Sequence, residues 1–157
     1  MKALTPNQIN SILGHATDVI HAARTFARSG DAGGYLCIGD NTTGVPFLLT
    51  LIGNMPEERA RACAGFAQEK NRRLGANLHH RTSWESRDEE KEQYPGAVRG
   101  KQLLWSFSGF PSKTDEAAML VSAIRCGDMT IEEATEIVGI TGNPVFHKLR
   151  EITLPTQ

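Results

Sequence analysis

Two strongly apolar segments constrain the fold of this 157-residue chain more than any other feature. VPFLLTLIG at 45–53 is rich in branched and aromatic residues, and LLWSFSGFPS at 103–112 alternates large apolar residues with serines. Both compositions are typical of β-strands. In the first segment both alternate sets of residues are largely apolar, so we expect this strand to be central in its sheet and covered on both faces.

The segments before and between them predict the neighbouring elements. Thr5 and Gln8 have the spacing of a capping box that opens a long amphipathic helix ending near Gly30. A strand at 35–39 and the turn-forming GDNTTG at 39–44 then predict a hairpin with the first apolar segment.

The rest of the chain predicts further helices. An alanine-rich helix over 56–74 is expected to begin with Asn54 as its N-cap. A tight hairpin at 97–108 is followed by a helix over about 112–125, and a capping box at Thr130 opens a shorter one. The chain is therefore predicted to be one α/β (α+β) domain built around an antiparallel sheet.

Composition and charge disfavour several kinds of partner and location. Seventeen basic and eighteen acidic side chains give a formal net charge of -1, which disfavours nucleic acid and anionic membranes as partners. The beginning MKALTPNQIN lacks the apolar core of a signal peptide, and no apolar run of about 18 residues could span a bilayer. Three distant cysteines without a C-x-x-C fit reduced thiols, and all this predicts a cytoplasmic protein.

Three sequence strings carry a resemblance to a known family. They are FAQEKNRRL at 66–74, VRGKQL at 98–103 and SFSGFPSKTDEAAML at 106–120. In this order and separation they resemble the GlcG/HbpS-like family of small haem- or small-molecule-binding proteins, over residues 5–125.

The resemblance implies a profilin-like fold, with an antiparallel sheet of about five strands flanked by helices, and assembly into homo-oligomers. We take residues 1–157 as a single domain of this type, with 129–157 as a C-terminal helical extension. The acid-rich crossover at 76–96 departs from the family, in which the corresponding segment is typically made of small, apolar and glycine residues.

The helix of the first string carries two candidate ligand-binding residues. Lys70 falls on the apolar stripe of its helix, three or four residues from Phe66, Ala67 and Leu74. Its ammonium therefore either reaches the rim of the domain or serves as an anion-binding or catalytic group. Arg73 is spaced to pair with Glu69, and it adds a planar, two-pronged donor for a carboxylate.

The crossover adds polar candidates. His79 and His80 are adjacent, so an extended backbone would point them in opposite directions and only one could act on a ligand, as a haem axial ligand or a general base. Together with these histidines, Arg81 and Trp84 are expected to form the polar wall of a ligand pocket. Ser108, on the serine face of the last strand, is the remaining candidate for ligand binding. The alternative for the two histidines is exposure to solvent on a loop.

No metal site is expected apart from a histidine ligand to haem, because the histidines and cysteines form neither H-E-x-x-H nor paired C-x-x-C motifs. The leading hypothesis is a homo-oligomeric protein that binds a small anionic molecule, with haem as one candidate. One alternative is a metal-independent enzyme acting on a small organic acid, and another is a non-catalytic interaction or scaffold protein.

Overall fold

The computed structural model describes residues 1–154, and its centre is one antiparallel sheet of four strands in the order β2-β1-β4-β3. Each neighbouring pair is antiparallel. The strands are β1 (Gly33–Asp40), β2 (Pro46–Gly53), β3 (Ala97–Arg99) and β4 (Leu103–Ser108).

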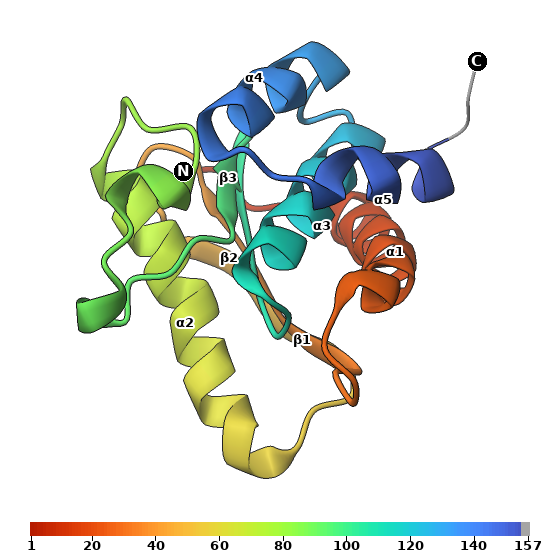
Figure 1. Ribbon diagram of the computed structural model, residues 1–157. Helices are drawn as coiled ribbons and strands as arrows, with labels where there is room; N and C mark the ends of the chain where they lie inside the picture. Colours follow the sequence, from red (N-terminus) through yellow and green to blue (C-terminus); the bar gives the residue numbers. More distant parts are fainter. Residues whose placement is uncertain (155–157) are drawn as a thin grey trace.

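Helices cover both faces of this sheet (Figure 1). One face packs against α2, and the other packs against α1 and α3, with α5 lying on the outside of α1 and α3. The helices are α1 (Pro6–Ala23), α2 (Glu57–Ala76), α3 (Ser112–Arg125), α4 (Ile131–Thr141) and α5 (Val145–Thr153), with short 3-10 helices η1 (Arg24–Phe26), η2 (Ser83–Ser86) and η3 (Glu89–Lys91). The mixed α+β fold agrees with the prediction.

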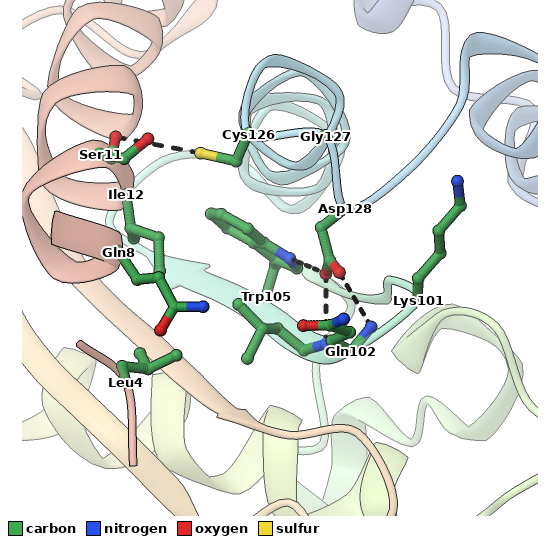
Figure 2. Close-up of a pocket in the computed structure, with 11 residues that line it drawn as sticks. Leu4, Gln8, Ser11, Ile12, Lys101, Gln102, Trp105, Cys126, Gly127 and Asp128 are labelled. Atoms are coloured by element: carbon green, nitrogen blue, oxygen red, sulfur yellow. Dashed lines mark hydrogen bonds between the residues drawn. The ribbon is translucent and has the colours of Figure 1, made fainter. Parts of the chain in front are cut away.

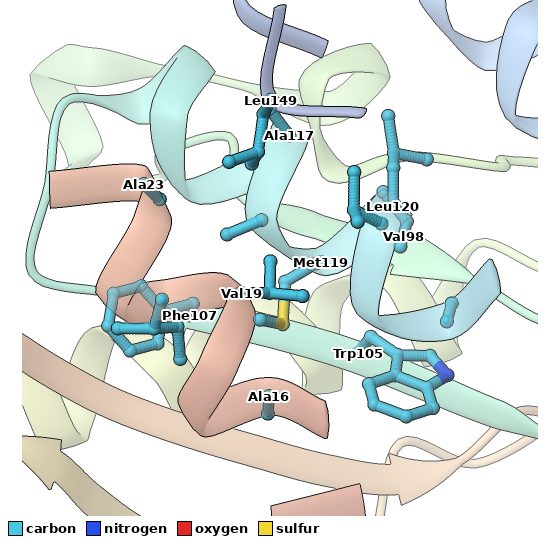
Figure 3. Packing of buried hydrophobic residues seen from close by; sticks show 14 of the residues in the cluster. Ala16, Val19, Ala23, Val98, Trp105, Phe107, Ala117, Met119, Leu120 and Leu149 are labelled. Atoms are coloured by element: carbon cyan, nitrogen blue, oxygen red, sulfur yellow. The ribbon is translucent and has the colours of Figure 1, made fainter. Parts of the chain in front are cut away.

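The main hydrophobic core lies between the sheet and the α1–α3 layer (Figure 3). Trp105 and Phe107 of β4 point into it and meet Val19 of α1 and Met119 of α3, all fully buried. Burial of each such side chain stabilises the fold by about 1.5–3 kcal/mol. The alternation in β4 is as predicted, because Ser106 faces the other way and its Oγ donates to Ala67 O of α2 at 2.5 Å.

Local capping signals were informative at two helices and misleading at a third. The capping boxes at Thr5 and Thr130 are both present. At α2, however, Pro56 occupies the N-cap position and no side chain among residues 1–154 caps the helix, so the prediction for Asn54 was wrong. The Asn54 N–H instead donates to Ala32 O at 3.2 Å, which extends the β1–β2 hairpin by one more bond.

The apolar strand β2 is an edge strand, which corrects the expectation that it is central. Among the strands of residues 1–154 it pairs only with β1, and Leu49 and Leu51 are 37% and 40% exposed. Because α2 packs chiefly on β1 and β4, the α2 side of β2 is left largely uncovered. Apolar composition indicates that a strand needs cover, but it does not say which element supplies it.

The sheet has four strands within residues 1–154, one fewer than the predicted five. The crossover after α2 approaches the sheet next to β3, where Thr82 forms a single isolated bridge with Val98 and the Arg99 N–H donates to Arg81 O at 2.9 Å. The chain then turns at once into η2, capped by Thr82. This contact is too short to count as a fifth strand.

The C-terminal helices are held to the domain by a buried carboxylate. Glu116 of α3 is 2% exposed and accepts hydrogen bonds from Thr82 (2.7 Å), Thr141 (2.9 Å) and Asn143 (2.8 Å). Burial raises the pKa of this carboxyl, and the three donors lower it. Residues 155–157 of the predicted helical extension lie outside the described residues. In the described part, no helix is long and apolar enough to cross a membrane.

Candidate functional site

A polar cleft opens where α2, the end of β4 and the beginning of α3 meet. Its volume is about 320 Å³. It combines cationic, apolar and hydroxyl-bearing side chains in one place, and it is lined by Arg28, Arg59, Cys63, Phe66, Lys70, Tyr94, Ser108, Gly109, Phe110, Pro111, Ser112 and Asp115. Lys70 and Ser108 are the two predicted ligand-binding residues that belong to it.

The floor of the cleft is a buried ion pair. Lys70 Nζ donates to Phe107 O at 2.7 Å and lies 3.3 Å from Asp115 Oδ2, and both side chains are only 3% exposed. Lys70 therefore neither reaches the rim nor stands alone in an apolar site. Gly96 makes room for it, because a Cβ on Gly96 would lie 2.6 Å from Lys70 Nζ.

Asp115 is the acid of the cleft whose pKa is strongly shifted. Its pKa is raised from the usual 3.8 to about 7, mainly because burial disfavours the carboxylate, although Lys70 and the Phe110 N–H lower it. Asp115 Oδ1 accepts the Phe110 N–H at 2.9 Å, which fixes the loop between β4 and α3. A carboxyl of this kind can exchange a proton near neutral pH.

Two arginines form the rim. The side chain of Arg28 is 58% exposed and that of Arg59 is 42% exposed, and both contact Asp31, which is 6% exposed. Arg28 Nε lies 3.1 Å and Arg59 Nη1 lies 3.4 Å from this carboxylate. Within residues 1–154 neither guanidinium makes a second side-chain contact, so most of their N–H donors can turn toward an anion in the cleft.

The beginning of α3 adds positive potential to the same cleft. Pro111 is its N-cap, and no side chain in the described part of the chain caps the helix. Ser112, the first residue of the helix, lines the cleft. The first N–H groups of a helix and its dipole favour an anion at this end. Opposite, the rings of Phe66 and Tyr94 pack edge to face at 5.3 Å and provide an apolar wall.

Arg73 has a structural role in the crossover rather than a place in the cleft. Its side chain donates to Ser83 O (2.9 Å), Ser86 Oγ (2.8 Å) and Tyr94 O (2.6 Å), and its Nε contacts Glu69. All parts of this guanidinium are therefore occupied within the chain. The predicted pair with Glu69 is present, and Arg73 holds the crossover against α2.

The remaining crossover candidates lie outside this cleft. His79 is exposed and His80 is half-buried, with its Nδ1 buried and unpartnered among the described residues. Arg81 pairs with Glu136 of α4. Trp84 lies beneath Arg87, whose guanidinium carbon is 3.6 Å from the ring centroid. Of these four residues, Arg81 ties the crossover to α4 through its ion pair.

The clefts described for residues 1–154 offer haem no histidine ligand from the crossover. An iron ligand from the crossover would have to be a histidine facing an apolar cavity, but neither His79 nor His80 lines the four clefts described for residues 1–154. The cleft near Lys70 is also at the small end of the 300–1,000 Å³ typical of ligand pockets. Haem binding thus stays a sequence-based expectation without support from the side chains.

A second cleft, of about 210 Å³, lies between α1 and the β3–β4 turn (Figure 2). Asp128 points into it, but its carboxylate already accepts from Gln102 N (2.8 Å), Leu103 N (3.2 Å) and Trp105 Nε1 (2.8 Å). Gly100 passes so close that a Cβ there would clash with Asp128. Asp128 therefore holds the turn, and this cleft offers little free chemistry.

The sequence alone missed Arg28, Arg59, Tyr94 and Asp115 as members of one site. Asp115 carried a usable signal, because an acid in the first turn of a helix after S-G-F-P is well placed to bond backbone N–H groups. The sequence around Arg28 and Arg59 contained no such signal. They come from α2 and from the segment after η1, which only the packed structure brings together.

Comparisons of the chain with protein-family models, with curated proteins and with solved structures found no match in any of the three. The resemblance to the GlcG/HbpS-like family therefore stays a prediction that depends on the three sequence strings.

Proposed function

We propose that this protein binds a small organic anion in the cleft at the beginning of α3. The observation that carries the proposal is the convergence of two half-exposed arginines, Arg28 and Arg59, with an uncapped helix beginning above a floor that contains Lys70. Guanidinium groups and helix N–H groups recognise carboxylates and phosphates by charge-assisted hydrogen bonds.

The volume and the walls narrow the class of ligand. A cleft of about 320 Å³ suits a compact molecule. The Phe66–Tyr94 wall offers apolar contact, while Ser108 and Ser112 offer hydroxyl groups. A carboxylate attached to a small ring or short apolar chain satisfies the rim and the wall together, whereas inorganic phosphate would use the rim alone.

Isothermal titration with benzoate, succinate and phosphate tests this proposal. We expect benzoate to bind more tightly than phosphate, because it can use the apolar wall as well as the rim. Replacing Arg59 with glutamine should weaken benzoate binding roughly tenfold or more, since a hydrogen bond to a charged group contributes about 1.5–3 kcal/mol. Arg28→Gln should act in the same direction.

Arg24→Gln is the matched control. Arg24 is exposed, lies four residues before Arg28 in the sequence and does not line the cleft. Its replacement should leave benzoate affinity unchanged. If none of the three anions binds the wild-type chain, or if Arg24→Gln weakens binding as much as Arg59→Gln, the proposal is wrong. Circular dichroism of each variant checks that the fold is intact.

One observation favours a second candidate, a metal-independent enzyme acting on a small organic acid. Asp115, with its pKa near 7, could act as a general acid or base on a molecule held by the arginines. Proton NMR of pyruvate incubated with the protein in D₂O would reveal exchange of its methyl protons. An enzyme of this kind requires that Asp115→Asn abolish the exchange.

We propose a cytoplasmic location, supported by the three cysteines, Cys37, Cys63 and Cys126, which are all free thiols. We also propose that the chain associates with copies of itself, as the family resemblance implies. The exposed apolar face of β2 supports such association.

A further inference from the structure

The cleft at the beginning of α3, which is the proposed anion site, contains a carboxyl group at its floor. Asp115 lines this cleft, and its side chain is only 3% exposed. Its Oδ2 lies 3.3 Å from Lys70 Nζ, and its Oδ1 accepts the Phe110 N–H at 2.9 Å. Among residues 1–154, Lys70 is the only ion-pair partner of this carboxylate. An anion that enters the cleft therefore brings a second negative charge toward a carboxylate that has a single cation in contact with it.

The cations of the cleft come from α2 and from the segment after η1. Lys70 of α2 lies at the floor and Arg59 of α2 at the rim, while the segment after η1 contributes Arg28. The charge of Arg28 acts on Asp115 and lowers its pKa, although Arg28 also pairs with Asp31. Against these three cations stand two carboxylates. The cleft therefore has one surplus positive charge when Asp115 is ionised and two when it is protonated.

Within residues 1–154, the other elements around Asp115 add no further charged side chain to the cleft. The crossover contributes the Tyr94 phenol and α2 contributes the Cys63 thiol, and no histidine is among the lining residues. Glu116, the next residue of α3, does not line the cleft and accepts three hydrogen bonds outside it. Asp115, whose pKa is raised to about 7 chiefly by burial, is therefore the group at the floor that can gain a proton near neutral pH.

Anion binding changes the surroundings of Asp115 in three ways that all favour its protonated form. The bound anion repels the carboxylate, engages the charge of Arg28 and displaces water from the cleft. Once Asp115 has taken up a proton, the charge of Lys70 is no longer compensated and acts on the anion instead. Because these effects have the same sign, none of them cancels another.

We propose that the cleft binds its organic anion together with a proton that Asp115 takes up, so that the anion is held at slightly acid pH and released as the pH rises above neutral. This regulation by pH rests on the proposed anion binding in the same cleft. The effect is reciprocal, because an anion that favours the protonated form of Asp115 is itself bound more tightly when that proton is present.

The size of the effect follows from the starting point of Asp115, whose pKa in the empty cleft is about 7. If the bound anion disfavours the carboxylate by a factor of about ten, benzoate affinity falls roughly tenfold between about pH 6 and pH 9. Over the same range proton uptake passes through a maximum of about half a proton for each benzoate bound, at about pH 7.5. Benzoate itself stays ionised throughout, so the change in affinity belongs to the protein.

Isothermal titration of the full chain with benzoate at about pH 6, 7.5 and 9 tests this coupling. At the middle pH the titration is repeated in bis-tris and in Tris, two amine buffers that differ in ionisation enthalpy and add no organic anion. The difference between the two heats measures the protons taken up on binding. We expect both the fall in affinity and the proton uptake in the wild type.

Asp115→Asn should abolish both effects, because the amide keeps the shape of the carboxyl group but does not titrate. This variant leaves the Lys70 ammonium buried without its partner, so the double variant with Lys70→Met, which removes both charges of the pair, is measured as well. In each, benzoate affinity should change less than about twofold between the extreme pH values. Glu116→Gln is the matched control, since Glu116 is an equally buried carboxyl of α3 outside the cleft, and it should keep the wild-type proton uptake.

Three results would each overturn the proton coupling and leave the anion site itself in place. They are wild-type binding without proton uptake, pH-dependent binding in a folded Asp115 variant, and loss of the uptake in Glu116→Gln. Absence of benzoate binding at every pH would instead refute the proposed anion site, and the coupling with it. Circular dichroism at each pH identifies the variants that are folded.

Discussion

Replacing Lys70 with methionine should destabilise the protein strongly at alkaline pH and mildly at acid pH. Methionine keeps the aliphatic stem but removes the ammonium, which contacts Phe107 O at 2.7 Å and Asp115 Oδ2 at 3.3 Å. Removing one partner of a buried ion pair costs about 3–5 kcal/mol, because the other charge stays buried and unpaired. This is a large part of the roughly 5–15 kcal/mol that holds a domain together.

The pH dependence follows from Asp115. Its pKa in the folded protein is about 7 with Lys70 beside it, against a usual 3.8, and loss of Lys70 raises it further. The folded variant therefore keeps a proton that the unfolded chain releases above its own pKa near 3.8. Stability from this group is complete below that value and is lost as the pH rises through the folded pKa.

At about pH 5 Asp115 is protonated in the folded variant, so no charge is stranded, and the remaining loss is the hydrogen bond to Phe107 O, about 1–3 kcal/mol. At about pH 8 the loss should reach about 3–5 kcal/mol. Urea unfolding followed by circular dichroism at both pH values measures the difference. Lys148→Met, an exposed lysine on α5, should change stability by no more than about 0.5 kcal/mol.

Adding Asp115→Asn to Lys70→Met removes the buried charge, so the double variant should lose its pH dependence between these two values. The reasoning fails if Lys70→Met costs less than about 1 kcal/mol at pH 8, or if it costs the same at both pH values. Either result would mean that water reaches the pair more freely than its 3% exposure indicates.

Three further substitutions test the packing around the site by urea unfolding. Gly96→Ala should cost at least about 1–3 kcal/mol, because its φ is +127° and the new Cβ meets Lys70 Nζ; a neutral effect would contradict this. Glu116→Gln should cost about 1–3 kcal/mol near pH 7, since an amide cannot accept from all three donors; an unchanged midpoint would argue against the network. Thr130→Ala should cost about 1 kcal/mol through its lost cap, and a loss below a few tenths would count against it.

Some residues of the candidate site could be predicted from the sequence, and others could not. The position of Lys70 on an apolar stripe predicted that its ammonium reaches the rim or binds an anion, whereas the structure pairs it with Asp115, from a helix 45 residues later. The closeness of His79 and Arg81 in a polar crossover suggested a pocket wall. In the structure His79 is exposed and Arg81 reaches α4, because the crossover turns into η2 instead of continuing along the sheet.

The sequence by itself determined much of the local structure, such as the capping boxes of α1 and α4 and the alternation in β4, because these signals act over a few positions. It did not determine the order of strands, so the apolar β2 was placed at the centre although it lies at the edge with Leu49 and Leu51 uncovered. Only the tertiary structure decided which side chains meet, since Arg28, Arg59 and Asp115 are brought together by packing between distant segments. The two apolar segments therefore identify the scaffold, and the chemistry comes from residues whose proximity no local pattern records.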